Sequence, residues 1–140
     1  MLNIRSCQEA DYESIIILWE HCGLTRPWND PETDIFRKVT QQDGLFLVAI
    51  KEQRLIGTVM GGYDGHRGWA SYLAVAPEQQ QLGVATALMQ QLEKRLIALG
   101  CPKLQLLVRT DNIDVINFYD KLGYASQDVI CLGKRLIEDI

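Results

Sequence analysis

The sequence has little of what a membrane protein or a nucleic-acid-binding protein needs. Its longest apolar runs, such as residues 15–19, are far shorter than the roughly 20 residues that span a bilayer. It has no basic run, and a net charge of −4 disfavours nonspecific binding to nucleic acid. Residues 1–5 lack the apolar stretch of a signal peptide. We therefore expect a cytoplasmic protein that binds neither a membrane nor nucleic acid.

The sequence also lacks the usual signs of metal or disulfide chemistry. Its cysteines form no C-x-x-C pair, and no histidine stands at the spacing of a zinc ligand. The pattern predicts no metal site and reduced thiols, some of them acting as small core hydrophobes. The four cysteines are Cys7, Cys22, Cys101 and Cys131.

The composition is that of a soluble globular protein. Of the 140 residues, 47% are hydrophobic and 23% are charged, which is too apolar for a disordered chain. This length is enough for one core and too short for two ordinary domains. We expect one domain over residues 1–140.

The first half of the chain predicts strands and helices in mixed order. Residues 1–5 form a strand, and residues 9–21 form a helix with one apolar face. Asp30 followed by Pro31 begins a second helix, whose apolar side is Ile35, Phe36 and Val39. Residues 45–51 and 55–63 form a hairpin, and residues 69–76 form the next strand.

The second half predicts two more helices and the remaining strands. An apolar stripe marks a helix that ends at Gly100, and residues 104–108 form a strand. Asp111 or Asn112 caps a fourth helix, and residues 124–126 and 129–133 form two last strands. The stripe consists of Ala85, Leu88, Leu92, Leu96 and Leu99. The whole order indicates an α+β fold rather than a strict βαβ alternation.

Residues 73–89 join an apolar strand to a long helix through a turn of small residues. Such a junction directs unpaired backbone N–H groups, and the positive end of a helix dipole, at one point. A phosphate or pyrophosphate is the natural ligand there. The turn matches neither a Walker loop nor a dinucleotide-binding motif.

Two motifs give this junction a more specific meaning. Gln80, Gly83 and Ala85 fit the pattern Gln/Arg-x-x-Gly-x-Gly/Ala, and residues 112–124 contain Asn, Phe-Tyr and Gly-Tyr in order. Together they resemble the acyl-CoA loop and the later segment of the GCN5-related N-acetyltransferases (GNAT family). The resemblance extends over nearly the whole chain, and residues 26–31 and 60–68 suggest a bacterial branch of the family.

The resemblance implies a mixed, mostly antiparallel central sheet of about 6–7 strands with four helices. It also implies a V-shaped splay between the fourth and fifth strands, into which acetyl-CoA inserts and from which coenzyme A leaves. The usual family loop has Arg-Gly where this chain has Gln80-Gln81, which removes one cation. The expected cofactor-binding residues are Leu73, Ala74, Val75, Gln80, Gln81, Leu82, Gly83, Val84, Ala85, Thr86, Asn112 and Tyr119.

The implied reaction is direct attack of a primary amine on the acetyl thioester in a ternary complex. A backbone N–H near Val75 would polarise the carbonyl. The resemblance places Tyr119 as the general acid that protonates the leaving thiolate. Asn112 would position the cofactor from the start of the same helix.

The general base is less clear from the sequence. Many family members carry a carboxylate on the strand that corresponds to residues 69–76, where this chain has Ser71 and Tyr72. Proton removal then falls to Asp64, to His66, to a water chain or to bulk solvent. Tyr72 is expected to be a wall of the pocket.

The resemblance implies that the acceptor is a small-molecule amine or a protein amine. Trp28, Asp30 and Asp64 are expected to form an aromatic and acidic mouth for a cation; Trp28 as a core staple is the alternative. A homodimer is compatible with the sequence. Two other functions stay open, namely a non-catalytic acyl-CoA sensor and an interaction module whose turn binds nothing.

Overall fold

A computed structural model describes residues 1–139 of the chain. The described chain forms two compact units. The larger unit contains residues 1–106 with Asp139, and the smaller contains residues 107–138. The expectation of one domain over residues 1–140 stays a prediction.

The larger unit is built on a five-stranded sheet in the order β1-β2-β3-β4-β5. The first four strands pair as antiparallel neighbours, and β5 joins β4 in parallel. The strands are β1 (Leu2–Ser6), β2 (Phe46–Lys51), β3 (Arg54–Tyr63), β4 (Gly68–Val75) and β5 (Leu104–Leu106). The β5 strand pairs with only the first three residues of β4, from Gly68 to Ala70.

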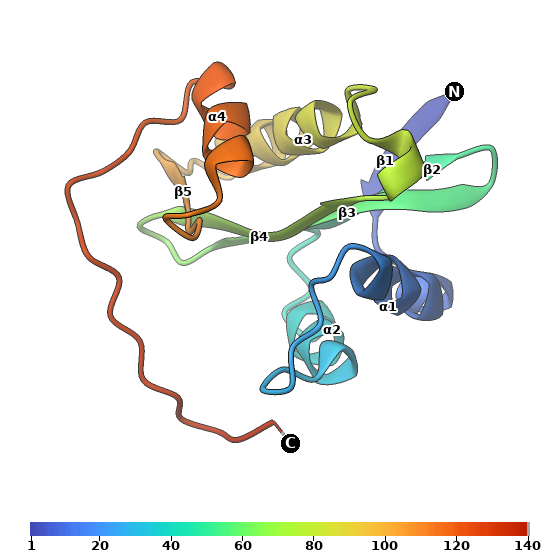
Figure 1. The fold of residues 1–140 in the computed structure, drawn as a ribbon, viewed down its shortest axis with the longest axis horizontal. Helices are drawn as coiled ribbons and strands as arrows, with labels where there is room; N and C mark the ends of the chain where they lie inside the picture. The colour runs from blue at the N-terminus through green and yellow to red at the C-terminus, as the bar shows by residue number, and fades with distance from the viewer. Residues whose placement is uncertain (140) are drawn as a thin grey trace. The chain divides into compact units, whose positions relative to one another are not determined.

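Helices cover both faces of this sheet, with α1 and α2 on one face and α3 on the other (Figure 1). Their bounds are α1 (Tyr12–His21), α2 (Pro31–Val39) and α3 (Val84–Ala98), with short 3₁₀ turns η1 (Glu9–Asp11) and η2 (Pro77–Gln79). Both faces of β2 are therefore covered, which explains why its residues 46–49 are all apolar and all buried.

Glycines let α3 approach the sheet closely. A Cβ atom on Gly61 of β3 would overlap the side chain of Leu92, and one on Gly57 would crowd Leu88. Because Leu88 and Leu92 are fully buried, there is no free space into which they could move. The predicted stripe of α3 is confirmed at Leu88, Leu92 and Leu96.

Two of the predicted core positions are wrong. Phe36 is 65% exposed and Leu99 is 53% exposed, although both fit a helical stripe. Ile35 is the buried apolar residue of α2, and Phe36 lies one residue further round the helix. Leu99 follows the end of α3, so the stripe extends past the part of the helix that touches the sheet.

The smaller unit contains helix α4 (Ile113–Lys121) and the segment that follows it. Asn112 caps α4 by accepting a hydrogen bond from the backbone N–H of Val115 at 3.4 Å, as expected for one of the two predicted caps. Tyr119 is the buried residue of this helix.

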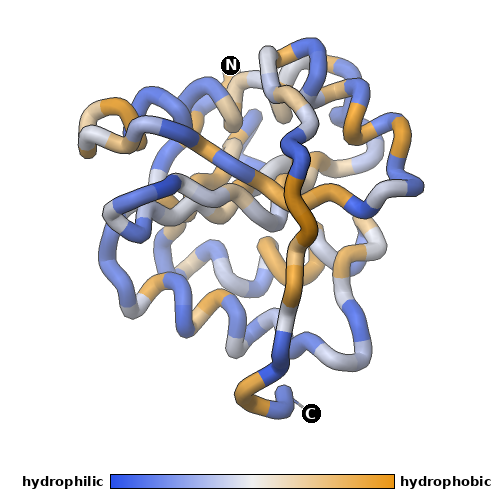
Figure 2. Tube along the Cα trace, turned by 90° about the vertical axis from the view of Figure 1, so that its left-hand side faces the viewer, coloured by the Kyte–Doolittle hydropathy of each residue, from blue (hydrophilic) through white to orange (hydrophobic). Residues whose placement is uncertain are grey.

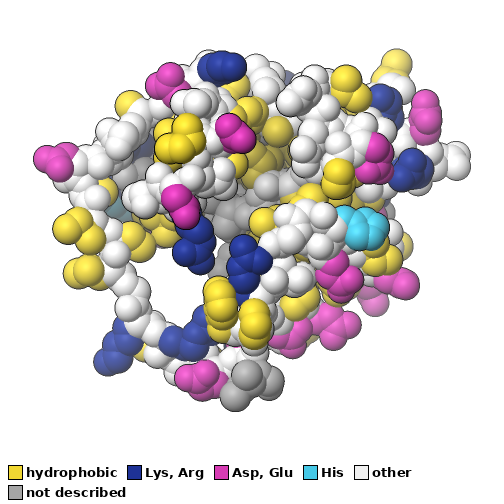
Figure 3. All heavy atoms as spheres, viewed as in Figure 1, with side chains coloured by type: hydrophobic (Ala, Val, Ile, Leu, Met, Phe, Trp, Pro, Cys, Tyr) yellow, Lys and Arg dark blue, Asp and Glu magenta, His cyan; other side chains and the backbone are white. Residues whose placement is uncertain are grey.

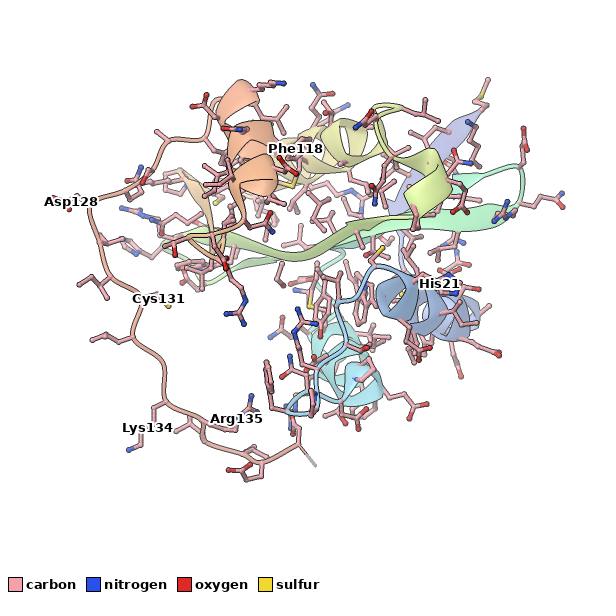
Figure 4. All side chains as sticks on the ribbon, viewed as in Figure 1. His21, Phe118, Asp128, Cys131, Lys134 and Arg135 are labelled. Carbon is pink, nitrogen blue, oxygen red and sulfur yellow. The ribbon has the colours of Figure 1, made fainter. Side chains whose placement is uncertain are left out.

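The two last predicted strands are wrong, so the sheet has five strands rather than about 6–7. Residues 125–138 contain no helix or strand, and Val129, Ile130 and Leu132 are each at least 77% exposed. Figure 2 shows hydrophobic residues along this stretch, and Figure 4 labels Cys131 and Lys134 on it. A strand needs a neighbour for its backbone hydrogen bonds, and an apolar sequence pattern does not supply one.

No helix among residues 1–139 is long and apolar enough to cross a membrane.

Candidate functional site

The β4 strand contains a bulge at its middle. Thr58 of β3 lies opposite Ala74, but two residues later Met60 lies opposite Ser71, so β4 has one extra residue in this interval. Tyr72 accommodates it with φ of +51°, a left-handed conformation that is uncommon for a tyrosine. A bulge of this kind interrupts the ladder and redirects the neighbouring side chains.

Two contacts with Trp19 hold the bulge in place. The indole ring stacks on the ring of Tyr72 with centroids 3.7 Å apart and an interplanar angle of 11°. The indole Nε1 donates to Thr58 Oγ1 at 3.0 Å, and Thr58 Oγ1 donates to the carbonyl oxygen of Tyr72 at 2.9 Å. Trp19 and Thr58 are fully buried, so this chain of hydrogen bonds is protected from water.

The hydroxyl of Tyr72 donates a 2.6 Å hydrogen bond to Asp34 Oδ2 on helix α2. Burial and the adjacent Asp34 carboxylate both raise the pKa of Tyr72 above its ordinary value, so the phenol stays protonated. The pair lies at a cavity of about 340 Å³ between α2 and the middle of the sheet. The cavity is lined by Asp34, Arg37, Lys38, Gln41, Met60, Ser71 and Tyr72.

Two cations of α2 also line this cavity, and they differ in their surroundings. Lys38 is buried, and its Nζ donates to Asp43 Oδ2 at 2.6 Å and to Gln41 Oε1 at 3.1 Å. Arg37 is about half exposed, and its guanidinium donates to both carboxylate oxygens of Asp139 at 2.9 Å. The surface around these cations is acidic, since Asp and Glu side chains gather over α1 and α2 (Figure 3). His21 marks the end of α1 in Figure 4.

The second half of β4 has a neighbour on one side only among the described strands. The N–H of Ala76 donates to Ile56 on β3, so the N–H and carbonyl of Val75 point to the opposite edge. The Val75 carbonyl accepts from the Cys22 thiol at 3.3 Å and from the Gln80 side chain at 3.1 Å. Gln80 thereby ties the end of β4 to the loop that follows.

That loop leads into α3 through two residues in the left-handed region. Gln81 has φ of +65° and Gly83 has φ of +85°, and Gly83 is the N-cap of α3. No side chain within residues 1–139 caps this helix, and a Cβ atom on Gly83 would point into open space. The first backbone N–H groups of α3 therefore have no side-chain cap among the described residues, which leaves them for another acceptor such as an anion.

The predicted cofactor residues of the larger unit are continuous in space. Leu73, Ala74 and Val75 end β4, and residues 80–86 form the loop and the first turn of α3. The hydrogen bond from Gln80 to Val75 joins the two groups.

Of the predicted acceptor residues, Tyr72 alone lines the cavity. Asp30 caps α2 by accepting from the N–H of Glu32 and the hydroxyl of Thr33. Trp28 is 49% exposed in the connection between α1 and α2. Asp64 and His66 lie in the turn between β3 and β4.

The carboxylate of Asp64 has a structural task in that turn. It accepts from the backbone N–H groups of Arg67 and His66 and from the indole of Trp69. These hydrogen bonds, that of Arg67 first, lower the pKa of Asp64 to about 2. A carboxylate with this pKa is a weak base.

In the smaller unit, the ring of Tyr119 meets Phe118 and Tyr124 edge to face, at 5.1 and 5.5 Å between centroids. Burial raises the pKa of Tyr119 to about 12. Its phenol is protonated throughout the physiological range.

Sequence reasoning did not find Asp34, Arg37 or Lys38. They recur at helical spacing on the polar side of α2, and that pattern is typical of any solvated helix face. Only the position of α2 against the bulge of β4 gives these residues a cavity. The departure at Ser71 and Tyr72 from the family's strand carboxylate was the one available hint that the site is built differently.

Residues 10–124 match the model of the acetyltransferase (GNAT) family. The chain is 57% identical over 138 residues to an acetyltransferase of Yersinia enterocolitica, covering 99% of this chain and 98% of that protein. A PaiA N-acetyltransferase of Thermoplasma acidophilum, solved with coenzyme A, is 23% identical with a TM-score of 0.75, covering 93% of each chain. The protein AAC(6')-Iy, solved with the bisubstrate analogue CoA-S-monomethyl-acetylneamine, is 18% identical with a TM-score of 0.75, covering 97% of this chain and 99% of that chain.

Proposed function

This chain belongs to the acetyltransferase (GNAT) family, and we propose that it transfers an acetyl group from acetyl-CoA to a primary amine by direct attack in a ternary complex. The enzyme acts in the cytoplasm as a single domain. The observation that carries the proposal is the end of β4, where a strand edge without a described partner leads into an uncapped helix start.

The outer edge of β4 supports the binding of the pantetheine arm. Pairing with β5 stops at Ala70, so no described strand pairs with the main chain from Ser71 to Val75 on that side. An extended chain with amide groups can add to such an edge as a further strand. We propose that β4 and β5 part here as the two arms of a V.

The start of α3 supports the binding of the pyrophosphate. Its first N–H groups lack a side-chain cap, and the helix dipole adds positive potential at the same place. Gly83 has no Cβ atom to cover these groups, and its left-handed φ turns the chain into the helix. The residues present therefore fit a diphosphate.

The transfer itself forms an N–C bond and breaks the C–S bond of the thioester. The backbone N–H of Val75 points to the open edge and is the proposed donor to the thioester oxygen. The amine loses a proton, and the thiolate of coenzyme A gains one. We propose that Tyr119, whose phenol is protonated at neutral pH, donates the proton that the thiolate gains. Asn112 is the residue proposed to position the cofactor.

Proton removal from the amine is assigned to water. Asp64 is a weak base because its carboxylate accepts three hydrogen bonds in a turn. For an α-amino group, deprotonation at neutral pH costs only about 1 kcal/mol, which water can meet.

Two measurements test this function. Calorimetry with coenzyme A tests the cofactor site without an acceptor, and release of free thiol from acetyl-CoA with a panel of amines tests the reaction. Binding that is lost in Gly83→Glu but kept in Gly65→Ala, a left-handed glycine in another turn, supports the proposed site. The absence of heat at millimolar coenzyme A would refute the function.

A further inference from the structure

The cavity beside the bulge carries opposite charges on one helix face. Asp34 and Arg37 are three residues apart on α2, and both line the cavity. The Asp34 carboxylate accepts a hydrogen bond from the Tyr72 hydroxyl, and the Arg37 guanidinium lies one helical turn further along α2. A ligand with one positive and one negative group would meet a partner for each.

Of the two cations that line the cavity, one is exposed to solvent and the other is buried. Lys38 is 8% exposed, and Asp43 and Gln41 occupy its ammonium group, so its charge is neutralised within the fold. Arg37 is 48% exposed and can be reached from solvent. The cation that selects a ligand is therefore Arg37.

The guanidinium of Arg37 already holds a carboxylate. Its Nη1 and Nη2 donate to Asp139 Oδ2 and Oδ1, both at 2.9 Å, from a position 102 residues away in the chain. This two-pronged geometry is the preferred way in which arginine recognises a carboxylate. The Arg37 side chain is 48% exposed and that of Asp139 is 7% exposed, so another carboxylate would approach the guanidinium from its solvent side and displace Asp139.

We propose that the acceptor is a small amine that also carries a carboxylate, of the size of an amino acid, and that Arg37 binds this carboxylate in place of Asp139. The inference rests on the proposed acetyl transfer. Asp34, held by Tyr72, attracts the ammonium form of the acceptor before it loses its proton. A cavity of about 340 Å³ is at the lower end of the range for ligand pockets, which suits a ligand of this size.

Matched pairs of acceptors test the proposal. Each pair is an amino acid and the amine that it becomes without its carboxylate, namely histidine and histamine, tyrosine and tyramine, lysine and cadaverine, and arginine and agmatine. We expect the carboxylated member of at least one pair to have the higher kcat/KM, by on the order of tenfold, because a charge-assisted pair is lost in the other.

Three variants separate binding by Arg37 from a general effect on the fold. Arg37→Gln should raise KM for the carboxylated member alone, so that the preference falls to about one. Asp139→Asn should lower that same KM, because it removes the competing carboxylate. Arg54→Gln, which changes an exposed arginine paired with Glu78 outside the cavity, should leave the preference unchanged.

Equal kcat/KM for both members of every pair, or no turnover of any carboxylated amine, would overturn the inference. Equal losses for both members in Arg37→Gln would do the same. The proposed function fails by a different result, since binding of acetyl-CoA is measured by calorimetry without an acceptor.

Discussion

The indole ring of Trp19 on α1 lies flat against the phenol ring of Tyr72 on β4, with centroids 3.7 Å apart. The same indole donates a hydrogen bond to Thr58, which in turn donates to the backbone of Tyr72. A left-handed residue in the middle of a strand is thus held through both its ring and its carbonyl. Because Tyr72 lines the proposed acceptor cavity, the core of the protein and its site share these contacts.

The first prediction concerns Thr58. Thr58→Val keeps the shape of the side chain but leaves the buried indole N–H of Trp19 without an acceptor. We expect the free energy of unfolding to fall by roughly 1–3 kcal/mol. Chemical denaturation measures this loss. Thr40→Val, at an exposed hydroxyl, is the control, and an equal loss in both variants would contradict the role of the network.

The second prediction concerns Gly83. Gly83→Ala and Gly65→Ala both place a Cβ at a left-handed residue in open space, so both should cost about 1 kcal/mol of stability. Only the change at Gly83 should weaken the binding of coenzyme A, and Gly83→Glu should abolish it by covering the N–H groups and repelling phosphate. Calorimetry of the three variants gives the comparison. Equal affinities in both alanine variants and in Gly83→Glu would remove α3 from the cofactor site.

The third prediction concerns Tyr119. Tyr119→Phe should lower kcat by roughly 100-fold or more and leave the affinity for coenzyme A nearly unchanged, because it removes only a proton donor. Since the pKa of Tyr119 is about 12, its ionisation should cause no fall in the rate below about pH 11. Tyr63→Phe, which removes a hydroxyl from an exposed contact, is the control. Unchanged turnover in Tyr119→Phe would exclude the role.

The fourth prediction uses the pKa of Asp64, which is lowered to about 2 in the folded chain. A carboxyl group with a lowered folded pKa stabilises the fold above its unfolded pKa, and this contribution disappears as the pH falls through about 2. The difference in Tm between the protein and Asp64→Asn should therefore be constant above about pH 5 and narrow between pH 4 and 2. The same variant should leave the pH–rate profile unchanged near neutral pH. A large fall in kcat together with loss of the acidic limb of the profile would instead make Asp64 the general base.

Much of the secondary structure in both units could be predicted from short-range patterns. The Asp30-Pro31 pair sets the start of α2, Asn112 caps α4, and alternating or continuous apolar runs locate β2, β3 and β4. Phe36 and Leu99 show the limit of such patterns. Each fits the apolar stripe of its helix and is nevertheless more than half exposed. The stripe alone does not predict which of its residues a neighbouring element covers.

Residues 129–133 show the same limit for strands. The sequence predicts a strand there, but strand pairing is a property of two segments, and no described strand pairs with them.

The sequence by itself determined the family, through Gln80, Gly83 and Ala85 and the later Asn-to-Tyr segment, because a phosphate-binding turn needs particular small residues at fixed spacing. The tertiary structure alone decided where the proposed acceptor cavity lies. Asp34, Arg37 and Tyr72 come from two elements that meet only when α2 packs beside the bulge of β4, and no local pattern encodes that contact.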